Sequence, residues 1–274
     1  MERRNVLTGL LCAGAAVAAS AVMTVVVPPT PAGSAEPERP PAASTPPPGR
    51  AAPPQSQSQG GGGAKREQPA GTPAYVGTMF ENGLDGGHFC TATVVRSPGR
   101  NLIVTAGHCL ADGRPGGGGA GALFAPAFSG GSAPFGTWRI EEVFQDPRWS
   151  QGGDDAYDLA FARLAPDDRG RNVEDVTGGA ELDTSGRTGE QVTVTGYPSD
   201  RDVPRTCTAT ATLPSPTEQR FDCPDFPAGT SGSAWIARDG RIVGVLTGGD
   251  TDDRSTSTVL GEYAAALYHR ATAR

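Results

Sequence analysis

The sequence predicts an all-β fold, a barrel or a sandwich, that ends in one helix. From about residue 74 onward, short β-branched or aromatic runs alternate with clusters of Gly, Pro, Asp and Ser. Many short strands at close spacing are typical of all-β barrels and sandwiches. After Glu262 the pattern changes, because Ala264, Leu267 and Tyr268 recur at helical spacing. We therefore expect a globular part over residues 74–274 that closes with a helix at 262–274.

Residues 1–35 are similar to an export signal. Two arginines at positions 3 and 4 precede an apolar stretch over residues 6–27, and the small residues 33–35 offer a cleavage site. The apolar stretch is longer than the ~7–15 residues usual for a signal core. An uncleaved membrane anchor is therefore the alternative to a signal peptide.

Residues 36–73 are dominated by Pro, Ala, Gly, Ser and Gln, with runs such as PPAASTPPPG and QSQSQGGGG. A segment of this composition buries too little apolar surface to offset the entropy lost on ordering. We expect a disordered linker or pro-region.

The globular part contains a series of predicted strands, each bounded by turn residues. They are Tyr75–Phe80, Phe89–Arg96, Leu102–Thr105, Thr137–Gln145, Leu159–Leu164, Gln191–Gly196, Thr206–Leu213, Ala234–Ala237, Ile242–Thr247 and Ser257–Leu260. Residues 166–187 are charged and Gly-rich and show no such pattern. We expect this segment to connect two halves of the fold, at about 74–165 and 187–261.

Charge and cysteine content narrow the class of protein. The net charge of −7 and the pI of about 5.0 argue against a nucleic-acid partner, which would require clustered Lys and Arg. Of the five cysteines, Cys12 lies in the apolar stretch and four remain beyond it. An even number fits two disulfides in an oxidising compartment. Four free thiols are the alternative, and no pair has the two-to-four-residue spacing of a zinc knuckle.

Three short motifs supply the groups of a nucleophilic hydrolase in chain order. They are TAGHC at 105–109, YDLA at 157–160 and GTSGS at 229–233. A serine hydroxyl needs an adjacent base to act as a nucleophile near neutral pH. The imidazole of His108 can accept that proton and return it, and the carboxylate of Asp158 can fix the imidazole tautomer. Ser231 would supply the hydroxyl.

These motifs, together with GHFC at 87–90, resemble the chymotrypsin-like serine peptidases, most of all their secreted bacterial members. The resemblance spans roughly residues 75–268. It implies two packed six-stranded antiparallel β-barrels, with His108 and Asp158 on the first and Ser231 on the second. The active site would lie between the barrels and would need no metal or organic cofactor.

The resemblance also implies roles for individual residues. His108 would be the general base, Asp158 its orienting partner and Ser231 the nucleophile, with the N–H groups of Gly229 and Ser231 forming the oxyanion hole. Cys90 and Cys109 would form the family's disulfide beside the catalytic histidine. The second disulfide, between Cys207 and Cys223, follows mostly by elimination.

The residue six before the nucleophile is Asp225, which by the same resemblance would lie at the base of the primary pocket and favour Arg or Lys before the scissile bond. Thr247, Gly248 and Gly249 would contact the substrate. Thr230 departs from the pattern, because animal members commonly have an acidic residue there. Activation through an ion pair with a newly freed N-terminus is therefore not expected.

Taken together, the sequence predicts a secreted, monomeric serine endopeptidase that acts on protein or peptide substrates. The alternative function is a catalytically silent binding or adhesion module on the same fold. The alternative location is the cell surface, reached if the N-terminal segment stays uncleaved.

Overall fold

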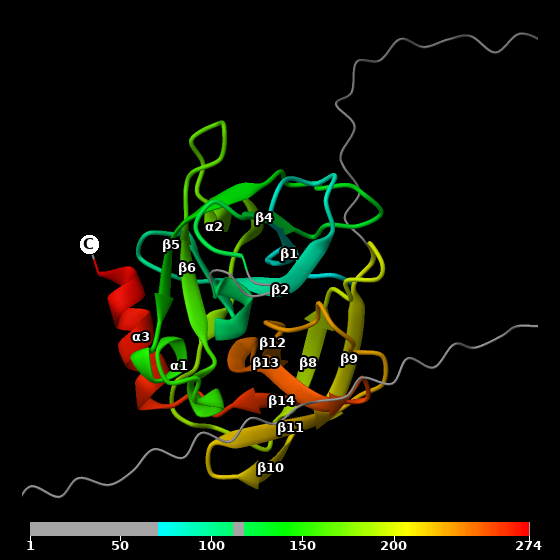
Figure 1. The fold of residues 1–274 in the computed structure, drawn as a ribbon, viewed down its shortest axis with the longest axis vertical. Helices are drawn as coiled ribbons and strands as arrows, with labels where there is room; N and C mark the ends of the chain where they lie inside the picture. Colours follow the sequence, from blue (N-terminus) through cyan, green and yellow to red (C-terminus); the bar gives the residue numbers. More distant parts are fainter. Residues whose placement is uncertain (1–70, 112–117, 274) are drawn as a thin grey trace, which may run out of the picture. The chain divides into compact units, whose positions relative to one another are not determined.

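The computed structural model describes residues 71–111 and 118–273 (Figure 1). The predicted export signal at 1–35 lies outside the described residues, and so does the predicted linker up to residue 70. In the part of the chain that is described, no helix is long and apolar enough to cross a membrane.

The first half is a closed antiparallel barrel with the strand order β1-β2-β3-β6-β5-β4. Its strands are β1 (Val76–Phe80), β2 (His88–Val95), β3 (Leu102–Thr105), β4 (Leu123–Pro126), β5 (Trp138–Gln145) and β6 (Ala160–Leu164). Alternation along β2 explains how the barrel fills. Cys90, Ala92 and Val94 point inward to the same cluster as Ile103 and Phe124, because successive side chains of a strand face opposite sides.

The second half is a curled sheet with the strand order β10-β11-β14-β13-β12-β8-β9. Its strands are β8 (Gln191–Gly196), β9 (Arg205–Thr210), β10 (Thr212–Ser215), β11 (Glu218–Asp222), β12 (Ala234–Ala237), β13 (Arg241–Thr251) and β14 (Arg254–Thr258), and the short β7 (Glu181–Leu182) pairs in parallel with β13. The all-β class and the C-terminal helix are confirmed. The second half of the predicted two-barrel fold is a curled sheet, a half-barrel whose edge strands β9 and β10 do not pair with each other.

The two edge strands of this sheet, β9 and β10, follow one another in the chain. Between them, the N–H of Ala211 bonds to the carbonyl of Glu190 and extends the β8–β9 ladder by one residue. The disulfide between Cys207 on β9 and Cys223 just after β11 joins the two ends of the sheet covalently. A disulfide therefore closes the curl where backbone pairing does not.

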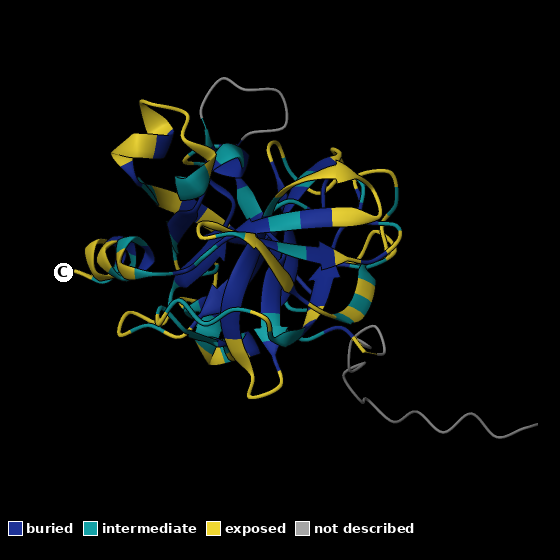
Figure 2. Cartoon of the chain, turned by 90° about the horizontal axis from the view of Figure 1, so that it is seen from below, coloured by how far each residue is buried: buried dark blue, intermediate teal, exposed yellow. Residues whose placement is uncertain are grey.

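The C-terminal helix packs the two halves together. Helix α3 (Glu262–Thr272) lies beside β5 and β6 (Figure 1). Its buried residues Ala264 and Leu267 belong to a cluster that also holds Val104 of the first half and Val245 of the second. Figure 2 shows the buried strands at the centre and the exposed loops around them. The remaining helices are short: α1 (Pro147–Ser150), α2 (Val173–Thr177) and the 3-10 turns η1 (Gly107–Leu110) and η2 (Asp155–Tyr157).

Candidate active site

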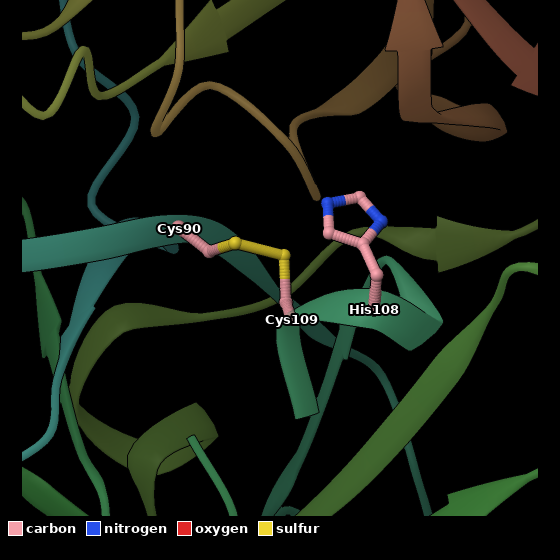
Figure 3. Close-up of side chains that lie close together, drawn as sticks. All are labelled: Cys90, His108 and Cys109. Atoms are coloured by element: carbon pink, nitrogen blue, oxygen red, sulfur yellow. A yellow bond between two sulfur atoms is a disulfide. The ribbon is translucent and has the colours of Figure 1, made fainter. Parts of the chain in front are cut away.

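His108 lies on η1, the single 3-10 turn that follows β3. The neighbouring Cys109 forms a disulfide with Cys90 on β2, with 6.1 Å between the two Cα atoms. Figure 3 shows this disulfide beside His108, whose ring projects from η1 toward a loop of the second half. The predicted Cys90–Cys109 bridge is confirmed, and it ties the histidine-bearing turn to the barrel wall.

Asp158 is buried and binds His108 with both carboxylate oxygens. Oδ2 lies 2.8 Å from Nδ1 of the imidazole, and Oδ1 accepts the backbone N–H of His108 at 2.7 Å. Gly107 makes this approach possible, because a Cβ there would lie 2.7 Å from Asp158 Oδ1. Since a carboxylate can only accept, Nδ1 carries the proton and Nε2 is left free to accept one.

Ser231 lies on the loop before β12, which rests against the first barrel. Its carbonyl accepts the N–H of Thr91 on β2 at 2.8 Å. A Cβ at Gly232, where φ is +86°, would collide with the carbonyl oxygen of Thr91 and the hydroxyl of Thr105. Thr105 ends β3, three residues before His108. The loop that carries the serine therefore packs against the strand that leads to the histidine.

The structure forms one of the two hydrogen bonds of the predicted triad. Within the described residues His108 bonds to Asp158, while no hydrogen bond joins its Nε2 to Ser231 Oγ. Catalytic hydrogen bonds are often long in enzymes without substrate and tighten when it binds.

The backbone around Ser231 presents two free N–H groups. The carbonyl of Ala228 accepts the N–H of Ser199 at 2.8 Å, and the carbonyl of Thr230 accepts the N–H of Ser233 at 3.1 Å. In a trans peptide the next N–H points the opposite way. Accordingly, the N–H groups of Gly229 and Ser231 donate no hydrogen bond within the described residues. Gly229 has φ of +94°, a conformation that favours glycine.

A pocket of about 290 Å³ opens beside Ser231, and a neighbouring groove of about 560 Å³ reaches Asp158. The two share Gly248, Gly249 and Asp250, and Thr247 lines the larger groove. The residues expected to contact substrate at 247–249 are thus brought to the site.

Asp225 is placed differently from the expectation. It is absent from the described lining of the pocket beside Ser231. Its carboxylate pairs with both terminal nitrogens of Arg201, at 2.5 and 3.1 Å, and lies 3.8 Å from Arg205. The Arg201 guanidinium holds the pKa of this carboxyl below its usual range. A carboxylate already paired with an arginine is poorly suited to bind a second cation in a pocket.

A metal centre at these residues is chemically disfavoured. Cys90, His108 and Cys109 offer ligand atoms within 4.8 Å of one another. The two sulfurs are joined in a disulfide, whereas metal binding requires thiolates.

Thr91 is a contact residue of the serine loop that no sequence motif indicated. It is fully buried on β2 and touches the serine loop. The alternation along this strand does not distinguish it from Thr93 two residues on, because both lie on the same face.

The family model described as a trypsin-like peptidase domain matches residues 90–245, more than half of the chain. The solved structure of the protease Anisep from Arthrobacter nicotinovorans is 26% identical with a TM-score of 0.66, and the match covers 74% of this chain and 97% of that one.

The thermostable serine protease AL20 from an extremophilic microorganism is 28% identical with a TM-score of 0.64, over 73% of this chain and 97% of that one. A Glu endopeptidase is 20% identical with a TM-score of 0.62, over 74% and 93% of the two chains, and shares the fold. A search of curated proteins found no match.

Proposed function

The chain belongs to the trypsin-like peptidase family, and from this premise we propose that it is a serine endopeptidase that cleaves peptide bonds through an acyl-enzyme on Ser231. The observation that carries the proposal is the buried Asp158 carboxylate fixed to Nδ1 of His108 at 2.8 Å. Asp158 lines a groove that shares Gly248, Gly249 and Asp250 with the pocket beside Ser231.

The pair supplies the acid–base step. With Nδ1–H held by Asp158, Nε2 of His108 accepts the hydroxyl proton as Ser231 Oγ attacks the substrate carbonyl carbon. The imidazolium then gives that proton to the leaving amine as the C–N bond breaks, which leaves the acyl group on Ser231. Asp158 stabilises the imidazolium, because its carboxylate is buried and carries the opposite charge.

The free amides supply the electrostatic step. The N–H groups of Gly229 and Ser231 would bind the oxyanion of the tetrahedral intermediate, and preorganised donors of this kind typically contribute about 2.7–4 kcal/mol each. A water molecule then gives its proton to His108 and attacks the acyl carbon. His108 returns that proton to Ser231 Oγ as the acyl C–O bond breaks, which releases the acid and restores the hydroxyl.

A preference for Arg or Lys before the scissile bond requires an acidic residue other than Asp225 in the pocket. Asp250 and Asp252 both line the pocket beside Ser231. Asp250 lies 3.6 Å from Arg254, whereas Asp252 is in no ion pair within the described residues. We assign the preference to Asp252. Asp252→Asn should reduce kcat/KM for peptides with Arg before the scissile bond relative to those with Leu, and an unchanged ratio would contradict this assignment.

Export and a monomeric state complete the proposal. Two disulfides fit an oxidising compartment, and all the proposed catalytic groups come from one chain. N-terminal sequencing of protein from the culture medium would test export. A start near residue 36 supports release, whereas protein retained on cells supports the anchored alternative. Size-exclusion chromatography would test the monomer.

Covalent labelling tests the nucleophile. A fluorophosphonate should label the wild-type protein, and Ser231→Ala should abolish both labelling and hydrolysis of fluorogenic peptides. Ser97→Ala is a matched control, because the buried Ser97 hydroxyl has no hydrogen-bond partner among the described residues. Persistent labelling of Ser231→Ala would place the nucleophile elsewhere. A wild-type protein that neither labels nor hydrolyses would favour the silent binding module.

A further inference from the structure

Thr91 lies at the junction between the two halves. It is fully buried on β2, and with Thr93 and Val95 it occupies the strand face opposite Ala92 and Val94. Val95 on this face packs in the cluster that contains residues of both halves, whereas Ala92 and Val94 fill the first barrel. The Thr91 side chain therefore faces the second half of the molecule.

Every polar group of Thr91 is used. Its N–H donates to the carbonyl of Ser231 at 2.8 Å, and its hydroxyl donates to the carbonyl of Gly229 at 3.1 Å. The same hydroxyl accepts the N–H of Tyr197 at 2.8 Å. Its carbonyl accepts the hydroxyl of Thr105 at 2.8 Å. One residue thus binds two carbonyls of the serine loop and the strand that leads to His108.

These contacts act on the residues whose amides are proposed to bind the oxyanion. Two carbonyls of the loop, those of Pro227 and Thr230, accept only from within the loop, because the Thr230 hydroxyl donates to Pro227 and the Ser233 hydroxyl donates to Thr230. The carbonyls of Gly229 and Ser231 are instead held from the first barrel by Thr91. The N–H of a residue belongs to the peptide plane before its Cα and the carbonyl to the plane after it. Holding the carbonyl in place therefore limits the φ and ψ rotations by which the N–H could turn away from the oxyanion position.

We propose that Thr91 is a positioning residue for the oxyanion hole, and that it sets the alignment of the Gly229 and Ser231 amides relative to His108. The proposal rests on the proposed serine-peptidase function. The Thr91 hydroxyl aligns Gly229, and the Thr91 backbone N–H aligns Ser231. Loss of the hydroxyl alone should therefore weaken transition-state binding while leaving substrate binding in the grooves largely intact.

Thr91→Val tests the hydroxyl with almost no change in volume. We expect kcat to fall about 10- to 100-fold with KM within about threefold of wild type, because a small misplacement of catalytic groups can cost about 100-fold in rate. Thr91→Ser restores a hydroxyl at the same position and should recover most of the lost kcat. The affinity of a peptide boronate, which mimics the tetrahedral intermediate, should fall by the same factor as kcat/KM.

Thr93→Val is the matched control. Thr93 is also fully buried on the same face of β2, but its hydroxyl has no hydrogen-bond partner among the described residues. We expect Thr93→Val to keep kcat within about twofold of wild type. Thr91→Ala replaces Thr91→Val if the latter does not fold.

The outcomes separate the two proposals. If the wild type hydrolyses peptides and Ser231→Ala does not, the proposed function stands. Equal kcat for Thr91→Val and Thr93→Val would then overturn the positioning role alone. A loss that Thr91→Ser does not recover, or failure of both Thr91→Val and Thr91→Ala to fold, would make Thr91 a purely structural residue and overturn it as well. An inactive wild type overturns both proposals.

Discussion

Replacing Asp158 by asparagine is the most informative single change at the site, because it conserves shape and removes one acceptor. The two oxygens of Asp158 accept from the ring Nδ1–H and from the backbone N–H of His108. An asparagine side chain has one acceptor oxygen and an NH₂ group that can only donate. If the oxygen stays on the backbone N–H, the NH₂ faces Nδ1. The imidazole then places its proton on Nε2, where it cannot accept the proton of Ser231.

The size of the effect follows from the contact that is lost, the one to Nδ1. A hydrogen bond to a charged group contributes about 1.5–3 kcal/mol, and at about 1.4 kcal/mol per tenfold change in rate its loss alone corresponds to about 10- to 100-fold. Holding the imidazole in the wrong tautomer adds to this loss, and we expect kcat to fall by about 10⁴-fold in total.

The assay is kcat and KM for a fluorogenic peptide, with Asp154→Asn as the matched control. Asp154 is exposed, and its side chain accepts the N–H of Ala156 at the start of η2. Asparagine serves equally well at such a position, so this variant removes the same charge nearby without disturbing His108. If Asp158→Asn stays within about tenfold of Asp154→Asn, the role given to the Asp158–His108 pair is refuted.

Three further outcomes can be checked on the same protein. Replacing Cys207 and Cys223 by serine removes a cross-link between residues separated by 16 positions. The free energy of unfolding should fall by about 3 kcal/mol, and Tm should fall by roughly 6–12 °C. An unchanged Tm in calorimetry would contradict this expectation. The Arg148 guanidinium holds the pKa of Asp146 below its usual value near 3.8. The Asp146–Arg148 ion pair therefore stabilises the folded state fully above pH ~3.8, and this stabilisation is lost as the pH falls below that value. The decrease of Tm with falling pH should be less steep in Asp146→Asn than in the wild type. Parallel curves of Tm against pH would argue against a stabilising role for this ion pair. Asp225→Asn should leave the ranking of peptides in a residue-preference screen unchanged, because Arg201 already binds the Asp225 carboxylate. A large loss of cleavage after Arg in this variant would support the predicted role of Asp225 in the pocket.

The sequence by itself determined the all-β class and most strands, and its motifs carried the resemblance through which the disulfide partners were expected. Predicted segments 102–105, 191–196 and 234–237 coincide with β3, β8 and β12. These strands are short, rich in β-branched or apolar residues and bounded by turn residues, so local pattern was sufficient. The catalytic motifs were readable for a similar reason. The chemistry requires particular residue types, and the close approach of Asp158 requires a glycine before His108.

Local pattern failed where distant residues decide the structure. Strand β11 was missed because its inward face pairs the apolar Phe221 with Gln219, a polar residue whose amide donates to the carbonyl of Val243 in the buried interior. The predicted strand 206–213 divides into β9 and β10 at Ala211. Strand β4 was missed as well, since LFAP is short and ends in proline.

The tertiary structure alone decided what each polar side chain near the site does. Arg201 lies 24 positions before Asp225 and neutralises it. Thr91 reaches Gly229 across 138 positions. Hydrophobic periodicity shows which face of a strand is buried, but it carries no information about which donor or acceptor of another segment will meet a buried hydroxyl or carboxylate. Those partners exist only once the two halves have packed together.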